Sequence, residues 1–369
     1  MNILGIETSC DETAAAVVRD GREVLSNVVY TQIPLHQPYG GVVPEVASRA
    51  HVEKIGPVVQ AAMEGQTVDA VAVTYGPGLA PALIVGLNAA KGLAKALGVP
   101  LIGINHLEAH LHTPFLYERS GESERPAADV QPENVTPALG LVISGGNTVW
   151  VDMPEYGVYK VIGETLDDAA GEAFDKAAKL LGLGYPGGLK IDRIASAYLH
   201  DQPSPASLVP FPRGRPREGV SALSGLPAEL CVSFSGLKTA LLRYTQQHPE
   251  ILGDKTGARD YGGYTVTPAV ARVVASYQEA IATAIADRTR TALRRRRYRS
   301  FVLGGGVSLN SRIRAGLSEV ASEAGVPLYM ARPKFTGDNG AMVAALAYYR
   351  QNHVADAMTL DVNPSLEIG

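Results

Sequence analysis

Residues 2–18, NILGIETSCDETAAAVV, and residues 138–153, ALGLVISGGNTVWVDM, follow one plan. Each has an apolar run, a turn rich in small and hydroxyl side chains, and a second apolar run. Short apolar runs bounded by polar turns are typical of buried strands. The two segments therefore predict a strand–turn–strand unit that occurs twice, in a chain built as two similar halves.

Around these two units, helical and strand-like segments alternate, which favours an α/β fold. Glycine, proline and capping residues delimit the helices. We expect helices within residues 39–64, 80–98, 165–184, 270–297 and 339–351, and strands within 69–78, 100–106 and 300–310. One lobe is predicted from residues 1–117 with 339–369, a polar surface insertion from 118–137, and a second lobe from 138–338.

Bulk composition excludes several classes of protein. The chain has 369 residues, 46% of them hydrophobic, and a formal net charge of −4. An acidic chain does not attract nucleic acid through its overall field, so an RNA partner would need a local basic patch. Two cysteines are too few for a disulfide framework. No signal peptide or membrane-spanning run is present, so we expect a soluble cytoplasmic protein with no membrane partner.

Three turns have the composition of an anion cradle: residues 7–13, ETSCDET; 144–148, SGGNT; and 304–310, GGGVSLN. Glycine and small residues let successive backbone amides approach a phosphate. Tight strand connections would give the same composition, and for any one turn the two interpretations weigh equally. None of the three is a P-loop or a G-x-G-x-x-G motif, which argues against Walker NTPases and Rossmann dehydrogenases.

The segment HLEAHLHTPF, residues 106–115, contains a histidine pair at a spacing of four. His106 and His110 share one helix face, and a carboxylate such as Asp338 would complete a two-histidine, one-carboxylate metal site. A purely structural pair is the more frequent case, and Asp338 also suits a helix N-cap. Glu108 projects about 200° away from His106, which argues against a zinc protease.

Two further features stay open at this stage. Asp11 and Glu12 lie in the first turn, where carboxylates either orient a nucleophile or simply face solvent. Seven arginines lie within residues 288–299, and three more within FPRGRPR, 211–217. Such a run is either a solvated helix end or a contact for an RNA backbone.

Nine segments together resemble the TsaD/Kae/Gcp family. They are GIETSCDETAAAVV, GGVVPEVASRAH, GPGLAPALIVG, NHLEAHLHTPFL, VISGGNT, GETLDDAAGEAFDKAAKLLGLGYPGG, SFSGLKTAL, GGGVSLNSRIR and DNGAMVAALA. The resemblance implies the two-lobed actin/Hsp70/sugar-kinase fold, with duplicated mixed-sheet lobes. It also implies transfer of a threonylcarbamoyl group from threonylcarbamoyl-AMP to the N6 amine of the tRNA adenosine next to the anticodon. This sequence departs from the family at Asn147, where a histidine is usual.

The resemblance also implies site residues and partners. One divalent metal, iron or zinc, falls on His106, His110 and Asp338. Contacts to the acyl-adenylate fall on Val142, Ile143, Ser144, Gly145, Gly146, Asp175, Gly188, Asp192 and Asn310. We expect Asp11 or Glu12 to orient the amine or take its proton. The implied partners are tRNA, a TsaB-like paralogue and a TsaE-like ATPase. The alternatives are a metal-dependent endopeptidase of proteins or glycoproteins, and a non-catalytic binding subunit of the actin/Hsp70 type.

Overall fold

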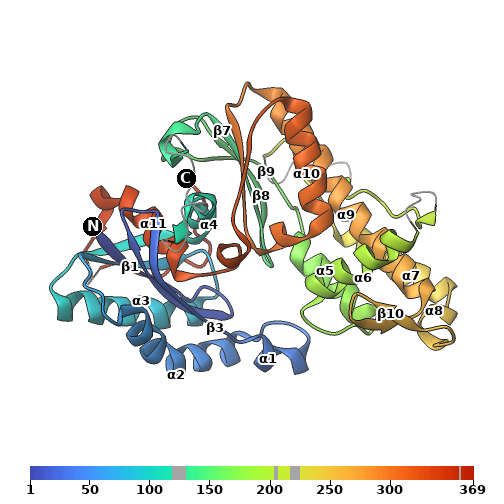
Figure 1. Ribbon diagram of the computed structural model, residues 1–369, viewed down its shortest axis with the longest axis horizontal. Helices are drawn as coiled ribbons and strands as arrows, with labels where there is room; N and C mark the ends of the chain where they lie inside the picture. Colours follow the sequence, from blue (N-terminus) through green and yellow to red (C-terminus); the bar gives the residue numbers. More distant parts are fainter. Residues whose placement is uncertain (119–129, 203–206, 217–224, 357–358) are drawn as a thin grey trace.

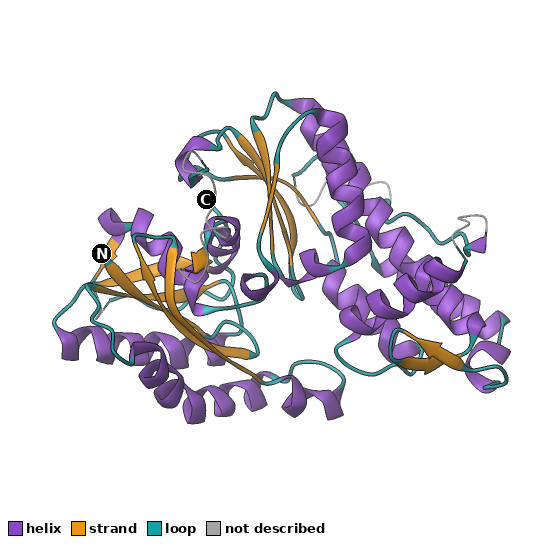
Figure 2. Ribbon diagram, viewed as in Figure 1, coloured by secondary structure: helices purple, strands orange, loops and turns teal. Residues whose placement is uncertain are grey.

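The protein is described by a computed structural model, which covers residues 1–118, 130–202, 207–216, 225–356 and 359–369 (Figure 1). Two mixed sheets, each flanked by helices, dominate it (Figure 2). The first sheet has the strand order β14-β5-β4-β1-β2-β3-β6 and the second β13-β12-β7-β8-β9. A separate hairpin pairs β10, Arg259–Tyr261, with β11, Tyr264–Val266.

The strands of the first sheet are β1 Asn2–Glu7, β2 Glu12–Arg19, β3 Glu23–Thr31, β4 Ala70–Gly76, β5 Leu101–Asn105, β6 Tyr117–Glu118 and β14 Val354–Ala355. Those of the second are β7 Ala138–Ile143, β8 Thr148–Met153, β9 Lys160–Glu164, β12 Ser300–Gly304 and β13 Leu328–Met330. In each sheet a three-stranded antiparallel meander is followed by two strands added in parallel beside its first strand. The predicted duplication is therefore confirmed, because five strands have the same order and direction in both sheets.

Both faces of the first sheet are covered, as the alternation of strand side chains requires. Leu4 and Ile6 pack with helices α2, Pro44–Met63, and α3, Ala80–Leu97, on one face. Ile3 packs on the other face with α11, Gly340–Tyr349. Gly5 is needed there, because a Cβ would lie 2.2 Å from the backbone oxygen of Gly340. The start of α11, just after Asp338, is thus seated directly on β1.

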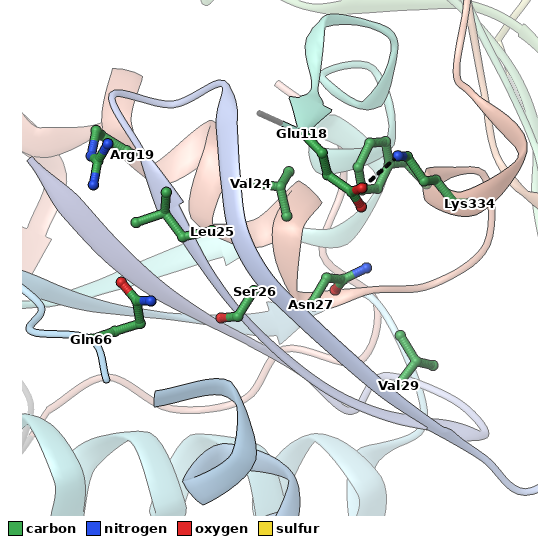
Figure 3. A pocket seen from close by; sticks show the side chains of 10 residues that line it. Arg19, Val24, Leu25, Ser26, Asn27, Val29, Gln66, Glu118 and Lys334 are labelled. Atoms are coloured by element: carbon green, nitrogen blue, oxygen red, sulfur yellow. Dashed lines mark ion pairs between the residues drawn. The ribbon is translucent and has the colours of Figure 1, made fainter. Parts of the chain in front are cut away.

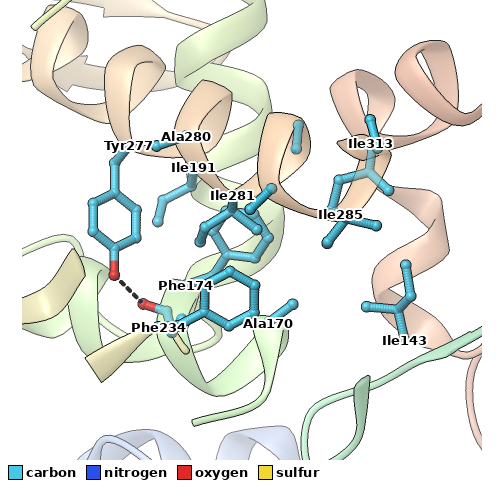
Figure 4. Packing of buried hydrophobic residues seen from close by; sticks show 14 of the residues in the cluster. Ile143, Ala170, Phe174, Ile191, Phe234, Tyr277, Ala280, Ile281, Ile285 and Ile313 are labelled. Carbon is cyan, nitrogen blue, oxygen red and sulfur yellow. Dashed lines mark hydrogen bonds between the residues drawn. The ribbon is translucent and has the colours of Figure 1, made fainter. Parts of the chain in front are cut away.

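The second sheet packs against a helical layer around α9, Pro268–Arg295 (Figure 4). The layer also contains α5 Ala170–Leu180, α6 Gly187–Asp201, α7 Ser235–Gln247 and α10 Ser311–Ala324. Phe174, Phe234 and Ile281 lie at its centre, all with no exposed surface. Two short helices, α1, Ile33–His36, and α8, Glu250–Gly253, are also present.

Helix α4, His106–His110, lies between the two lobes. Ala109 packs into the first-lobe core with α11, whereas Leu107 and Leu111 pack on the second sheet beside Val142 and Val302. One short helix therefore contacts both halves of the molecule. The histidine segment is shorter than a typical helix because Leu111 begins a turn that leads into a 3₁₀ segment, Thr113–Phe115.

The structure changes some predicted boundaries. The helix expected from residue 165 begins at Ala170, because the amides of Thr165 and Leu166 instead bond to Thr148 and Val232. Of the predicted insertion 118–137, residues 119–129 lie outside the described residues. Glu118 belongs to β6, and Val135 is buried in the core beneath the second sheet. Among the described residues, no helix is both long and apolar enough to cross a membrane.

Candidate functional site

The histidine pair and Asp338 meet at the junction of the lobes. Nε2 of His110 lies 3.1 Å from Oδ1 of Asp338, and Nε2 of His106 lies 3.7 Å from the same oxygen. The two imidazole rings are 4.7 Å apart, edge to face. One nitrogen or oxygen from each of the three residues lies within 4.8 Å of the other two. The chain thus brings Asp338 beside two histidines that lie more than two hundred residues earlier in the sequence.

The chemistry of these atoms fits a metal ion. Both ring nitrogens of His110 are buried; among the described residues Nδ1 has no hydrogen-bond partner, and Nε2 has only the carboxylate of Asp338 close by. Buried polar atoms of this kind are costly unless something satisfies them. A cation between the imidazole nitrogens and the carboxylate would satisfy Nε2 of His110. Two imidazoles and one carboxylate are a donor set that proteins use for zinc and for iron.

Glu7 stands behind the histidines, and our sequence analysis did not include it among the site residues. Its Oε2 lies 3.1 Å from Nδ1 of His106 and accepts a hydrogen bond of 2.6 Å from the hydroxyl of Thr74. A carboxylate on Nδ1 leaves Nε2 of the same imidazole free for a metal and fixes the ring orientation. The sequence did hold one signal, because Glu7 is the only charged residue of the otherwise apolar strand ILGIE. A charged residue at a strand end is also compatible with a solvated turn, so the sequence did not show that Glu7 is buried.

Charge in this cluster is strongly coupled. Burial alone would raise the pKa of Glu7, but the adjacent His106 outweighs burial and keeps it below its ordinary value. Burial likewise opposes charge on His106, yet Glu7 and Asp338 raise the pKa of its imidazole to about 9. The two histidines lower the pKa of Asp338 to about 2 against the effect of burial. The site thus attracts positive charge, as a proton or as a metal.

Asp11 and Glu12 lie in the turn between β1 and β2. Asp11 is buried, and the hydroxyl of Tyr185, from the second lobe, lies 3.5 Å from its Oδ2. Glu12 accepts a hydrogen bond of 3.2 Å from Thr31. Burial, and then the negative charges of Asp11 and Asp338, raise the pKa of Glu12 well above its ordinary value. A carboxyl group with such a pKa binds a proton more readily than a solvated glutamate.

The turn from Ser144 to Asn147 occupies the equivalent place between β7 and β8. The amide of Ser144 bonds to the oxygen of Asn147, and the amide of Asn147 to the hydroxyl of Ser144. Gly145 and Gly146 are exposed, with open space where a side chain would be. The side chains of Val142 and Ile143 are fully buried in two different cores, so only their backbone could contact a ligand.

The third glycine turn, which begins at Gly304, packs between helix α4 and the end of strand β7. A Cβ on Gly304 would lie 2.3 Å from the backbone oxygen of His110. Gly305 has φ of +90°, and a Cβ there would lie 2.3 Å from the backbone oxygen of Ile143. Both positions therefore require glycine: Gly304 because of its close contact, and Gly305 because of its close contact and its positive φ. This packing fixes α4, which carries the histidine pair, relative to the Ser144 turn.

The remaining predicted contacts lie where α6 and α10 begin. Oδ1 of Asp175 accepts from the amide of Gly187 at 2.7 Å, and the space above Gly188 is open. Oδ1 of Asp192 accepts from the amide of Ser311 at 3.1 Å and from its hydroxyl at 2.6 Å. Asn310 caps α10 through the amide of Ile313, at 3.1 Å. These polar groups are therefore engaged in fixing helix ends, and they join α6 to α10.

Glu108 does not face the metal group. Its Oε2 lies 2.8 Å from Nη2 of Arg350, and its Oε1 accepts from the amide of Gly369 at 3.3 Å. The carboxylate is buried and already paired, so it is not available as the base of a zinc protease. The geometric argument from the sequence is confirmed on this point.

The arginine run is mostly engaged with acidic or backbone partners. Arg288 is buried, and its guanidinium donates to backbone oxygens of Cys231 and Gly214. The other pairs are Arg290 with Glu323, Arg295 with Glu229, and Arg296 with Asp152. The run also precedes β12, whereas the glycine turn follows it. It therefore lies at the sheet edge opposite to the site.

A cavity of about 790 Å³ lies away from these residues, along the outer edge of β3 (Figure 3). Ser26, Asn27 and Val29 line it from the strand, and Lys334 reaches across to Glu118 at 2.8 Å. None of the residues predicted to bind substrate or metal lines this cavity. It is therefore separate from the candidate site.

Comparison with known proteins shows the family of the chain. The family model TsaD, described as tRNA N6-adenosine threonylcarbamoyltransferase, matches residues 23–345. A protein of that name from Anaeromyxobacter dehalogenans is 47% identical, over 93% of this chain and 92% of its own length. Another from Thermomicrobium roseum is 43% identical, over 100% and 97% respectively.

One solved structure supports the fold alone. Full-length HypF in its phosphate- and nucleotide-bound form has a TM-score of 0.51 at 11% identity, over 94% of this chain and 55% of its own length. Together with the duplicated mixed sheets, this likeness confirms the predicted actin/sugar-kinase type of fold. From the family match over most of its length, the chain belongs to the tRNA N6-adenosine threonylcarbamoyltransferase family, TsaD.

Proposed function

We propose that the chain transfers a threonylcarbamoyl group from threonylcarbamoyl-AMP to the N6 amine of the tRNA adenosine next to the anticodon. The observation that carries this beyond family membership is the group His106, His110 and Asp338 at the lobe junction. It lies in the same junction as the Ser144 turn, because Gly304 and Gly305 pack against both. A group-transfer enzyme needs both an electrophilic centre and a leaving-group site within one cleft.

His106, His110 and Asp338 would hold one divalent ion, iron or zinc, with Glu7 fixing the His106 ring. Bound there, it would supply a Lewis acid that stabilises negative charge developing on an oxygen of the acyl donor. The buried Nε2 of His110, which faces only the Asp338 carboxylate among the described residues, supports this assignment.

The second lobe would bind the adenylate. The exposed amides of Gly145 and Gly146 suit the phosphate, with the backbone of Val142 to Ser144 shaping the turn. Asp175, Gly188, Asp192 and Asn310 would surround ribose and base where α6 and α10 begin. Open space over Gly188 leaves room for a ligand there.

The first-lobe turn would handle the proton. Attack by the N6 amine forms a bond from nitrogen to the carbamoyl carbon, and the bond from that carbon to the phosphate oxygen breaks to release AMP. The amine must also lose one proton. Glu12 would accept this proton, because burial raises the pKa of its carboxyl group. Asp11 would orient the incoming adenine of the tRNA.

We also propose that the chain works in the cytoplasm with a TsaB-like paralogue and a TsaE-like ATPase. The family resemblance supports these partners, and the tRNA substrate supports the compartment. The assembly would bring the chain to full activity, whereas the acyl-transfer site lies within this chain alone.

Transfer of labelled threonylcarbamoyl from its adenylate to tRNA tests this function, with the purified chain alone and with both partners. We expect labelled tRNA and stoichiometric AMP, lost on chelation and restored by metal. Digestion of casein and of a glycoprotein is measured in parallel. Chelator-sensitive peptide cleavage without label on tRNA would overturn the proposal in favour of the endopeptidase. If the chain catalyses neither reaction, the result would favour a non-catalytic binding subunit.

A further inference from the structure

A second cavity, of about 470 Å³, lies in the second lobe beside the start of α7. Arg215, from the segment that enters the cavity, and Arg243, from α7, both line it. The hydroxyl groups of Ser233, Ser235 and Thr239 lie in the same wall. Both arginines are exposed, and neither forms an ion pair with any residue that the structure describes.

The floor of this cavity is held rigidly. The buried Arg288 donates to the backbone oxygens of Gly214 at 3.0 Å and Arg213 at 3.3 Å. The amide of Ser233 also bonds to the oxygen of Gly214, at 3.0 Å. The segment bearing Arg215 is therefore fastened from two directions, which reduces the entropy lost when a ligand binds.

One acidic residue, Asp167, also lines the cavity, but its carboxylate is engaged. It accepts from the hydroxyl of Ser233 at 2.5 Å and from the amides of Phe234 at 2.7 Å and Ser235 at 3.2 Å. Burial opposes its charge, yet these hydrogen bonds lower the pKa of Asp167, so it stays ionised. Arg215 and Arg243 have no carboxylate partner in the part of the chain that the structure describes, and Asp167 is engaged, so the described lining carries net positive charge.

The cavity lies at the same edge of the sheet as the proposed adenylate turn. Strands β7 and β9 both run antiparallel to β8, so their carboxyl ends lie at one edge. Ser144 follows β7 there, and Asp167 follows β9. Between them the amide of Thr165 bonds to Thr148 at 2.9 Å, and that of Gly171 bonds to Ser144 at 3.3 Å. One short segment, 165–171, thus separates the cavity from the proposed site.

We propose that this cavity binds a backbone phosphate of the tRNA and positions the RNA along the rim of the cleft. Guanidinium groups hold phosphate oxygens with two hydrogen bonds. The hydroxyl groups of Ser233 and Thr239 already donate within the protein, so their oxygens would accept from a ribose 2′-OH. An acidic chain needs such a local patch to bind RNA. This inference rests on the proposed function, because it takes tRNA as the substrate.

The test compares two double variants that each remove two exposed positive charges. Arg215→Ser with Arg243→Ser changes the cavity, whereas Arg294→Ser with Arg297→Ser changes the opposite sheet edge. The Kd for tRNA is measured over a series of salt concentrations with the full chain and no acyl donor. We expect the cavity variant to bind about tenfold more weakly at low salt, with a salt slope smaller by about one to two. The control should keep the wild-type affinity and slope.

Unchanged affinity and slope in the cavity variant would overturn the proposal, as would an equal loss in both variants. AMP binding, measured by calorimetry, separates RNA from a free nucleotide. We expect the same Kd for AMP in the wild type and the cavity variant, and a parallel loss would make the cavity a mononucleotide site instead. Because tRNA binding is measured without acyl donor, a chain that binds tRNA but transfers nothing refutes the proposed function and not this contact.

Discussion

The carboxylate of Glu108 lies 2.8 Å from the guanidinium of Arg350 and joins α4, which carries the two histidines, to the end of α11, the helix that follows Asp338. Glu108 lies between His106 and His110 on α4, and Arg350 ends α11, which begins two residues after Asp338. The pair therefore fixes the distance between the histidines and the aspartate. Glu108, whose position in the sequence argued against a zinc protease, holds α4 to the end of α11 in the structure, as a brace between them.

Replacing Arg350 with Met should weaken metal binding, because the brace is lost and a buried carboxylate is left without its cation. We expect the Kd for the metal to rise about tenfold. We also expect the free energy of unfolding to fall by about 2 kcal/mol, which is small for a broken buried pair because 20% of the Arg350 side chain is exposed. Metal titration and denaturant unfolding measure these. Arg296→Met, which breaks a more exposed pair with Asp152, serves as control and should change stability by less than about 1 kcal/mol. Wild-type metal affinity in the Arg350 variant would contradict the brace.

Replacing Glu7 with Gln should separate metal binding from proton transfer. Gln keeps the shape of the side chain but loses the charge that orients His106, so we expect metal affinity to fall about ten- to hundredfold. Glu12→Gln should instead keep the metal affinity and lower the rate of transfer at saturating substrate. Metal content by elemental analysis and single-turnover transfer are measured on both variants. If Glu7→Gln binds metal as tightly as the wild type, Glu7 has no positioning role.

Gly304→Ala should displace the metal-site helix. Its methyl group would lie 2.3 Å from the backbone oxygen of His110, which has no flexible end to move away. We expect a loss of about 1–3 kcal/mol of stability together with weaker metal binding. Gly92→Ala, where no atom lies within 4 Å of the new Cβ, should leave metal affinity unchanged and slightly raise stability. Equal behaviour of the two variants would show that the glycine turn does not position α4.

Acid should destabilise the first-lobe turn through His51. Its Nε2 donates to the backbone oxygen of Cys10 at 3.0 Å, and its Nδ1 accepts from the hydroxyl of Thr13 at 2.8 Å. Burial lowers the pKa of His51 from its ordinary value of 6.5, although the hydrogen bond to Cys10 and the charges of Glu7 and Asp11 oppose this. The folded state therefore binds its proton at lower pH than the unfolded state does. Its contribution to stability is complete above 6.5 and is lost as pH falls from 6.5 toward the lowered pKa.

Denaturant unfolding from pH 8 to pH 5 checks this, with His51→Gln as the comparison. We expect the variant to be less stable at neutral pH and to lose less stability on acidification than the wild type. His36 lies in the same network and its pKa is lowered by burial as well, so part of the acid dependence should remain. Identical pH dependence in the two proteins would exclude His51 as the titrating group.

The fold was largely predictable because its signals are local. The apolar runs and their turns marked the duplicated strands, and the spacing of the histidines marked one helix face. The start of α5 could not be predicted in this way, because the backbone hydrogen bond between Leu166 and Val232 joins segments that are distant in the chain. Local capping rules place the helix earlier, and a long-range backbone bond overrides them.

The site was predictable only in part. The histidine spacing suggested two ligands and donor chemistry offered Asp338 as a possible third, but a helix N-cap was an equal alternative for Asp338 until the family resemblance was considered, because its approach to the histidines depends on how α11 packs on β1. Glu7 was missed since burial of a carboxylate depends on neighbours such as Thr74 that no local pattern reveals. The cavity around Arg215 and Arg243 is likewise a tertiary feature: the sequence marked Arg215 within FPRGRPR, but no local pattern placed Arg243 of α7 beside it.

The central claim is that His106, His110 and Asp338 hold the metal on which transfer depends. Single-turnover transfer by His106→Ala, with metal content and unfolding measured on the same sample, tests it most directly. We predict a folded chain that binds no stoichiometric metal and transfers no threonylcarbamoyl group to tRNA. Full transfer by the metal-free variant would contradict the account.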